Sequence, residues 1–241
     1  MLTSFDSIAR KDRVIIALDC DADKAISIAY QLAGEATWVK VGMTLYYAYG
    51  TDLIKMLKER GYKVFLDLKF YDIPHQVEGA ARSATESGAD MITMHTMGGV
   101  AMMRAAQAGA EAGAARIGGE VPTTLGITVL TSMDQSSLTQ IGIDKPVVDE
   151  VSSLASLTTK AGISGVVASP QEARMLRSQL GEGAYIVCPG VRPAGSAVGD
   201  QSRVATPKEA FDAGASHIVI GRPITDAPDP IQAFRQIAEA L

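Results

Sequence analysis

The sequence predicts an α/β protein, a single-domain (β/α)8 TIM barrel that spans residues 1–241. Three observations favour this fold. Short runs rich in β-branched residues alternate with helical stretches eight times, the connections between them are short, and no Pro/Ser-rich linker or change of composition divides the chain. Alternation of this kind is typical of a parallel sheet that closes into a barrel surrounded by helices. A chain of 241 residues is also long enough for one large barrel.

Each predicted strand is a short apolar run that ends at a polar or turn-forming residue. The strands are expected at residues 14–19, 38–42, 62–66, 91–95, 124–129, 165–168, 185–188 and 217–223. Helices are expected at residues 22–32, from the second strand to about 60, at 76–87, 100–112 and 146–161, and at the end of the chain. Pro170 and Pro207 are placed to begin the helices that follow the sixth and seventh strands.

Composition excludes several classes of protein. The net charge of −5 argues against a nucleic-acid binder, which usually has a basic face. No apolar run approaches the roughly 20 residues of a membrane span, and the first ten residues do not resemble a signal peptide. Cys20 and Cys188 lie far apart, without neighbouring histidines, so neither a disulfide framework nor a zinc site is expected. A cytoplasmic protein that binds neither nucleic acid nor membrane is the expectation.

The string from Asp67 to Gln76 carries the strongest chemical signal. Asp67 and Lys69 lie two apart on the third strand, so their side chains are expected on the same side of the sheet. Asp72 follows three residues later, and Pro74 discourages continuation of the strand. Two carboxylates would keep the lysine protonated, and a charged lysine in a cleft can donate a proton. The alternative is an ion pair that only closes the end of a strand.

Further polar side chains lie where predicted strands end, at the rim that carries the active site in such barrels. They are Asp19, Lys40, Asp67, Lys69, Thr131 and Arg222. Lys40 is notable because it lies within an apolar strand, where lysine is seldom buried unless it is paired. The alternative is a surface lysine whose stem covers apolar groups.

The loops after the seventh and eighth strands indicate a phosphate site. Arg192 lies two residues after Gly190, and Arg222 directly follows Gly221. Barrels of this type commonly bind phosphate with these two loops, and arginine offers paired donors while glycine allows close approach of a backbone N–H.

The three histidines give no hydrolase or metal signature. His75 and His217 stand alone, and no serine lies in a Gly-x-Ser-x-Gly turn. His95 ends the fourth strand and is expected to be a hydrogen-bonded core histidine, not a metal ligand. No metal site is predicted.

Several strings occur in order at the spacing of barrel strands: Ala17-Leu18-Asp19, Lys40-Val41-Gly42, Asp67 to Pro74, Val129-Leu130-Thr131-Ser132, Pro189 to Pro193, and Gly221-Arg222-Pro223. Through them the chain resembles, from end to end, the bacterial orotidine 5'-monophosphate decarboxylases. The resemblance implies a cofactor-independent carboxy-lyase that converts orotidine 5'-phosphate to UMP and carbon dioxide, the last step of de novo pyrimidine synthesis.

The resemblance also implies roles for individual residues. Asp67 would lie beside the substrate carboxylate, and Lys69 would protonate carbon 6 of the ring. Lys40 and Asp19 would hold the ribose hydroxyls and the network of charges. The remaining implied contacts are Thr131 with the pyrimidine, and Arg192, Gln201, Gly221 and Arg222 with the phosphate.

A homodimer with composite sites is implied as well, because Asp72 and Ile73 would reach the active site of the neighbouring chain. One position departs from the family pattern. Many members follow Asp-Ile-Pro with Asn-Thr, whereas this chain has His75-Gln76. Gln76 would then replace a threonine that contacts the neighbour's ribose, with a longer and more mobile side chain.

Two other functions are weighed against this one. A 3-keto-L-gulonate 6-phosphate decarboxylase of the same superfamily shares the Asp-x-Lys-x-x-Asp string but uses magnesium, with an acidic residue near the position of Lys40. A lysine there would repel the metal. A non-catalytic barrel that binds a phosphoribosyl group would have no need of Asp67 beside a substrate anion.

Overall fold

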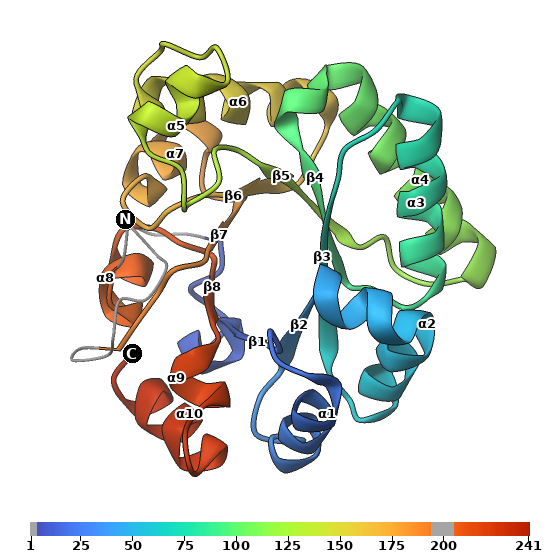
Figure 1. The fold of residues 1–241 in the computed structure, drawn as a ribbon, viewed down its shortest axis with the longest axis vertical. Helices are drawn as coiled ribbons and strands as arrows, with labels where there is room; N and C mark the ends of the chain where they lie inside the picture. The colour runs from blue at the N-terminus through green and yellow to red at the C-terminus, as the bar shows by residue number, and fades with distance from the viewer. Residues whose placement is uncertain (1–3, 194–204) are drawn as a thin grey trace.

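The computed structural model describes residues 4–193 and 205–241, and it confirms the predicted fold. Eight parallel strands pair in chain order and close into a barrel, β1 pairing with β8. Figure 1 shows the strands around the centre and the helices outside them. No helix in the described part of the chain is both long and apolar enough to cross a bilayer.

The strands are β1 Val14–Ala17, β2 Trp38–Gly42, β3 Lys63–Phe70, β4 Met91–His95, β5 Thr123–Ile127, β6 Gly165–Val167, β7 Tyr185–Cys188 and β8 His217–Ile220. The helices are α1 Ala22–Gln31, α2 Met43–Glu59, α3 Pro74–Glu86, α4 Gly99–Ile117, α5 Gln135–Gln140, α6 Val147–Ala161, α7 Ala173–Leu180, α8 Pro207–Asp212, α9 Arg222–Thr225 and α10 Pro230–Glu239. Two 3-10 turns, Arg10–Arg13 and Thr96–Gly98, complete the described elements.

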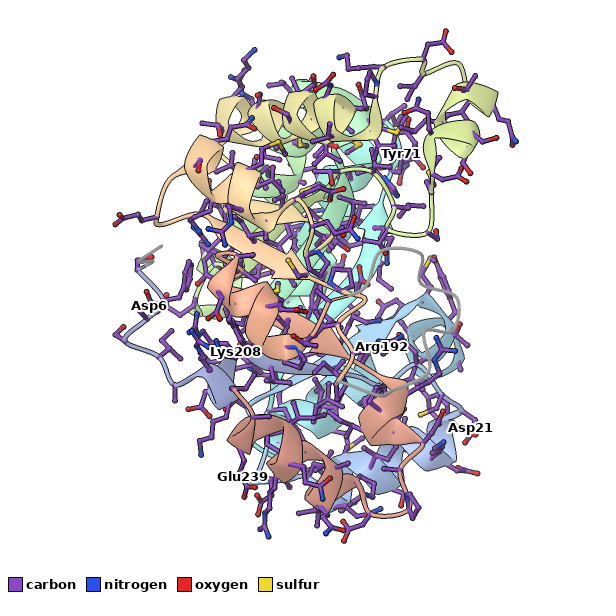
Figure 2. The ribbon with its side chains drawn as sticks, turned by 90° about the vertical axis from the view of Figure 1, so that its left-hand side faces the viewer. Asp6, Asp21, Tyr71, Arg192, Lys208 and Glu239 are labelled. Carbon is purple, nitrogen blue, oxygen red and sulfur yellow. The ribbon has the colours of Figure 1, made fainter. Side chains whose placement is uncertain are left out.

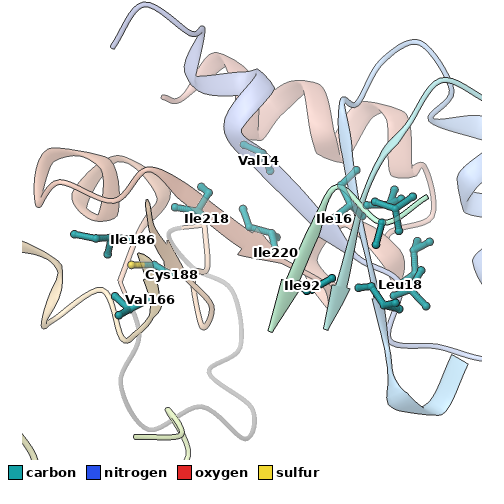
Figure 3. Close-up of a cluster of buried hydrophobic side chains, with 14 of the residues drawn as sticks. Val14, Ile16, Leu18, Ile92, Val166, Ile186, Cys188, Ile218 and Ile220 are labelled. Atoms are coloured by element: carbon teal, nitrogen blue, oxygen red, sulfur yellow. The ribbon is translucent and has the colours of Figure 1, made fainter. Parts of the chain in front are cut away.

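Most strand residues are buried whichever way they point, because one face of the sheet faces the barrel interior and the other faces the helices. On β1, Val14 and Ile16 belong to the larger apolar cluster between sheet and helices, whereas Ile15 and Ala17 belong to a smaller cluster inside the barrel. Figure 3 shows part of the larger cluster, with side chains from β1, β4, β6, β7 and β8. This double burial explains why the strands are continuous apolar runs in the sequence.

Aromatic side chains fill the barrel interior at the N-terminal ends of the strands. Trp38 begins β2, Tyr185 begins β7 and His217 begins β8, and the His217 ring lies 5.6 Å from each of the other two ring centres. Phe5 packs edge-on against Tyr185 at 4.7 Å. In the described part of the chain these rings therefore pack across the N-terminal end of the barrel.

Several boundaries differ from the predicted ones. The polar loop after β5 contains α5, which Asp134 caps by accepting a hydrogen bond from the Ser137 backbone N–H. The eighth strand ends at Ile220, and the residues after Gly221 form the short helix α9. Pro207 begins α8 as predicted.

Pro170 does not begin a helix. It lies in a turn, and α7 starts three residues later, because the buried Glu172 carboxylate accepts a hydrogen bond from the Ser169 N–H and closes that turn first. Cys20 is half-buried and Cys188 is buried, and both are free thiols.

Candidate active site

A cavity of about 460 Å³ opens at the C-terminal ends of the strands. Its floor consists of apolar side chains that point into the barrel, among them Ala17, Phe65 and Val219. Its wall contains these residues that the sequence singled out: Asp19, Lys40, Asp67, Lys69, Thr131, Arg192, Gly221 and Arg222. The polar strand ends that are dispersed along the sequence therefore line one cavity.

Four side chains on the β1–β3 side of the cavity form a row of alternating charge, which we call the charged row. The Lys40 ammonium lies 2.7 Å from the Asp19 carboxylate and 3.7 Å from that of Asp67. The Lys69 ammonium donates a hydrogen bond to Asp67 Oδ2 at 2.8 Å. Each ammonium in the row thus faces a carboxylate, and Asp67 lies between both lysines.

The charged row is shielded from water at its centre. Lys40 and Asp67 are each 8% exposed, so the alternative of Lys40 as a surface lysine is wrong. Burial alone would raise the pKa of the Asp67 carboxyl. The Lys40 and Lys69 ammonium groups, together with hydrogen bonds from Lys69 and Thr93, outweigh that effect and hold the pKa below its ordinary value. Asp67 is therefore a carboxylate at neutral pH.

The backbone of Lys69 departs from a regular strand. Lys69 has φ +53°, the only positive φ at a non-glycine residue in the described part of the chain. The β3–β4 register also shifts between Leu66 and Phe70. The contact between the Lys69 and Asp67 side chains was predicted from regular alternation along the strand. In the structure an irregular backbone brings the two side chains together. Such conformations are costly and cluster at functional sites.

Thr93 on β4 was missed by sequence reasoning. Its hydroxyl donates a hydrogen bond to Asp67 Oδ1 and accepts one from the Lys69 backbone N–H, each at 2.9 Å. The signal in the sequence was a hydroxyl residue in the otherwise apolar string Met91–His95. Threonine is common in strands, so this signal alone did not indicate a contact with the motif.

Arginines occupy the opposite side of the cavity, near β7 and β8 (Figure 2 labels Arg192). Gly190 has φ +75°, a conformation that favours glycine, and turns the chain after β7. The Arg192 backbone N–H then donates to the Ala205 carbonyl, which anchors the arginine beside the cavity. Arg222 follows Gly221 at the first position of α9. Gln201, also predicted to contact phosphate, lies outside the described residues.

Asp72, Ile73 and Gln76 do not line the cavity of their own chain. All three are exposed, and the Asp72 carboxylate accepts a hydrogen bond from the Ile73 N–H. The expectation that Asp72 flanks Lys69 within one chain is wrong, since the ion pairs of the described residues join Lys69 to Asp67 alone. The reason is that the chain turns outward after Phe70, where β3 ends.

A second hollow of about 490 Å³ adjoins the charged row on the α2 side. Its wall includes Lys40, Asp67 and Lys69, which also line the first cavity, together with Gly42 and Met43 at the start of α2. The two ammonium groups are therefore accessible from a second direction.

His95 is not the hydrogen-bonded core histidine that was expected. Its Nδ1 is buried without a hydrogen-bond partner, and its ring lies 5.3 Å from that of Tyr71. Burial and the nearby Lys69 ammonium lower the pKa of the imidazole, while Asp67 acts in the opposite direction. Among the described residues, no three His, Cys, Asp or Glu side chains gather in a way that could hold a metal ion.

Residues 12–237 match the protein family described as Orotidine 5'-phosphate decarboxylase / HUMPS. The chain belongs to this family. The resemblance found in the sequence is thereby confirmed, and it extends over nearly the whole chain.

Individual members of the orotidine 5'-phosphate decarboxylase / HUMPS family agree with this placement. The orotidine 5'-phosphate decarboxylase of Moorella thermoacetica is 47% identical over 233 residues, covering 96% of this chain and 92% of that protein. The orotidine 5'-phosphate decarboxylase of Nitrosococcus oceani is 46% identical over 228 residues, covering 94% and 96% respectively. The crystal structure of orotidine 5'-phosphate decarboxylase from Lactobacillus acidophilus has a TM-score of 0.84 at 38% identity, covering 95% of this chain and 98% of that one.

Proposed function

We propose that this chain decarboxylates orotidine 5'-phosphate to UMP and carbon dioxide. The observation that carries the proposal is one cavity with the Lys69–Asp67 ion pair at one side and two arginines at the other. This arrangement suits a ligand with a reacting carboxylate at one end and a phosphate at the other. Relatives that match more than nine-tenths of the chain bear the name of this activity.

Lys69 is the proposed proton donor. Breaking the bond between carbon 6 and the departing carboxyl carbon leaves an electron pair on carbon 6. The Lys69 ammonium transfers a proton to that carbon, becomes a neutral amine, and regains a proton from solvent. Its charge is already held in place by Asp67 at 2.8 Å, so little reorganisation is needed when negative charge develops on the ring.

Asp67 and Lys40 complete the proposed catalytic group. In the proposal the substrate carboxylate lies beside Asp67, which is ionised and buried. Repulsion between the Asp67 carboxylate and the substrate carboxylate raises the energy of the bound substrate, and departure of neutral carbon dioxide removes that repulsion. Lys40 lies between Asp19 and Asp67, where its charge offsets the repulsion between the two carboxylates. In the proposal Lys40 and Asp19 also hold the ribose hydroxyls.

The phosphate provides binding energy at a distance from the reacting carbon. Arg192 and Arg222 line the β7–β8 side of the cavity, and each charge-assisted hydrogen bond contributes on the order of 1.5–3 kcal/mol. Energy from a non-reacting group can position the ring against Lys69. We assign the pyrimidine contact to Thr131, which lines the same cavity after β5, and assign Gln201 and Gly221 to the phosphate.

A magnesium-dependent sugar-phosphate decarboxylase is the competing function, since the Asp-x-Lys-x-x-Asp string is common to both kinds of decarboxylase. The Lys40 ammonium favours the nucleotide reaction. It lies 2.7 Å from the Asp19 carboxylate and 3.7 Å from the Asp67 carboxylate, the oxygen groups that would hold a divalent cation. A metal placed there would meet a buried positive charge. The proposed reaction uses no metal or other cofactor.

The proposed enzyme is a homodimer with composite sites. Asp72 and Ile73 project from their own chain, and Ile73 is 63% exposed, as is usual for a side chain that packs against a partner. Met43, Tyr47 and Tyr71 are also exposed near the same end of the barrel. The second hollow would admit the partner's carboxylate to Lys40 and Lys69. Sedimentation as a monomer at assay concentrations would contradict this assembly.

A cytoplasmic location belongs to the same proposal, because the substrate is a phosphate ester whose charge prevents passage across a membrane.

The test of the function is the fall in orotidine 5'-phosphate absorbance with purified protein in EDTA. Rapid conversion to UMP is expected. No conversion in EDTA, with activity on a keto-sugar phosphate after magnesium is added, would instead establish the competing function.

A further inference from the structure

We propose that Thr93 is a positioning residue that holds the Asp67–Lys69 pair in its working geometry. The inference rests on the roles proposed above for Asp67 and Lys69. Thr93 lies on β4, outside the Asp67 to Gln76 string, and it is fully buried. It does not line the cavity, so it acts through the two catalytic groups and not on the substrate.

The hydroxyl of Thr93 connects both members of the pair. A hydroxyl has one proton to donate and lone pairs to accept with. Because the Asp67 carboxylate can only accept, the Thr93 proton points to Asp67 Oδ1, at 2.9 Å. A lone pair of the same oxygen then accepts the Lys69 backbone N–H, also at 2.9 Å. Both bonds therefore have a defined direction.

These bonds lie where the β3–β4 pairing is irregular. Leu66 pairs with Ile92, and the next pair joins Phe70 to Met94. The single residue Thr93 thus lies opposite the three residues Asp67, Leu68 and Lys69. A regular ladder cannot provide a partner for every backbone group of such a bulge. The Thr93 side chain provides the partner for the Lys69 N–H.

The hydrogen bond to Lys69 also stabilises an uncommon backbone conformation. Lys69 has φ +53°, in the left-handed region that a residue with a long side chain rarely adopts. Strained conformations persist where the surroundings hold them in place. Here the Thr93 oxygen fixes the Lys69 amide while Asp67 Oδ2 fixes the Lys69 ammonium. The lysine is held at both ends, and its Nζ is aimed into the cavity.

The test compares Thr93→Val, which removes the hydroxyl but keeps the shape of the side chain, with Thr93→Ser, which keeps the hydroxyl. We expect Thr93→Val to lower kcat for orotidine 5'-phosphate by about 10- to 100-fold, since it removes a hydrogen bond to a charged group. KM should change by less than about threefold, because the arginines are untouched. Thr93→Ser should retain most of the turnover.

Thr85→Val is the matched control. Thr85 is a buried threonine on α3 whose hydroxyl donates to the Ala81 carbonyl, away from the cavity. The control should lose some thermal stability and keep kcat. If Thr93→Val also keeps kcat, or if Thr93→Ser is as impaired as Thr93→Val, the positioning role is wrong.

A crystal structure of Thr93→Val separates this inference from the proposed reaction. We expect Lys69 to leave the left-handed region and its Nζ to move away from Asp67. Lys69 retained at positive φ with the ion pair intact would overturn the inference, whatever substrate the enzyme uses. Failure of the parent protein to consume orotidine 5'-phosphate would overturn the proposed function alone.

Discussion

Gly42 leaves the space that the Asp19 and Lys40 side chains of the charged row occupy. A Cβ atom at this position would lie 3.1 Å from the Asp19 carboxylate and 3.3 Å from the Lys40 ammonium. Both distances are tighter than ordinary packing, so a side chain at this position would require Asp19 and Lys40 to shift by a few tenths of an ångström. The string Lys40-Val41-Gly42 therefore combines a buried cation with the space that its partner needs.

Lys69 and Asp72 allow a direct test of a composite active site. Lys69→Ala should lose nearly all turnover and still bind UMP, because the arginine side of the cavity is intact. Asp72→Ala should also be inactive. If Asp72 completes the active site of the neighbouring chain, a hybrid dimer with one chain of each variant contains one active site in which both Lys69 and Asp72 are present. Mixing under conditions of subunit exchange should then restore about a quarter of the parent activity.

The control for this experiment is a mixture of Lys69→Ala with Arg222→Ala. Lys69 and Arg222 line the same cavity of one chain, so every site in that hybrid lacks one of them and no recovery is expected. An absence of recovery in the Lys69 and Asp72 mixture, with hybrid formation verified by mass spectrometry, would show that the two residues do not act across the interface.

The pair of helices α3 and α4 shows how glycine sets the distance between elements. The two helices lie side by side on one flank of the barrel (Figure 1). Gly109 and Gly113 on α4 face the α3 backbone, and a Cβ at Gly109 would lie 2.1 Å from the Glu78 carbonyl oxygen. The glycines lower helix propensity, but they permit a close approach that a larger residue would prevent.

Gly109→Ala should therefore destabilise the protein, by about 1–3 kcal/mol or more, since the clash is with backbone atoms that cannot rotate away. Gly79→Ala on α3 is the matched substitution. A Cβ at Gly79 would meet only the end of Arg82, at 4.0 Å, so this change should stabilise by about 0.5–1 kcal/mol. Urea unfolding of both variants measures the difference. Equal effects of the two substitutions would exclude the packing explanation.

The two ends of the barrel have opposite character. The rings of Phe5, Trp38, Tyr185 and His217 pack across the N-terminal end, whereas the C-terminal end holds the charged cavity. Burial lowers the pKa of His217 to about 3, and the Arg13 and Lys63 charges act in the same direction. His217 is consequently neutral in the folded protein at any pH where the enzyme is expected to work.

This buried histidine makes stability depend on pH. The unfolded chain binds a proton at His217 below about pH 6.5, whereas the folded chain does not, so stability falls as pH decreases from about 6.5 toward 3. The slope is about 1.4 kcal/mol per pH unit, which predicts a loss of about 2 kcal/mol between pH 7.5 and pH 5.0.

His217→Gln removes that dependence, and denaturant unfolding at the two pH values measures it. The variant should lose about 2 kcal/mol less than the parent on going to pH 5.0. Between pH 7.5 and 8.5 the two proteins should change in parallel, because His217 is neutral in both states there. An equal loss in parent and variant at pH 5.0 would show that His217 is protonated in the folded barrel.

Much of the molecule was predictable because its determinants are local along the chain. Strands buried on both faces must be continuous apolar runs, so the strands at residues 38–42, 91–95 and 185–188 were predicted with the bounds that the structure has. Charged residues at strand ends were predictable for the same reason. Lys40 and Asp67 interrupt apolar runs, and the barrel rule places such interruptions at one rim.

Contacts between distant segments could not be read in this way. The link from Thr93 to Asp67 and Lys69 depends on a bulge that sets one residue of β4 against three of β3. The spacing of α3 and α4 depends on which face of α4 carries Gly109. The periodicity of apolar side chains specifies which residues are buried. The register between two strands and the distance between two helices are decided only when the two elements pack together. The sequence alone therefore predicted which charged side chains make up the site. Their positions relative to one another depend on how one strand packs against the next.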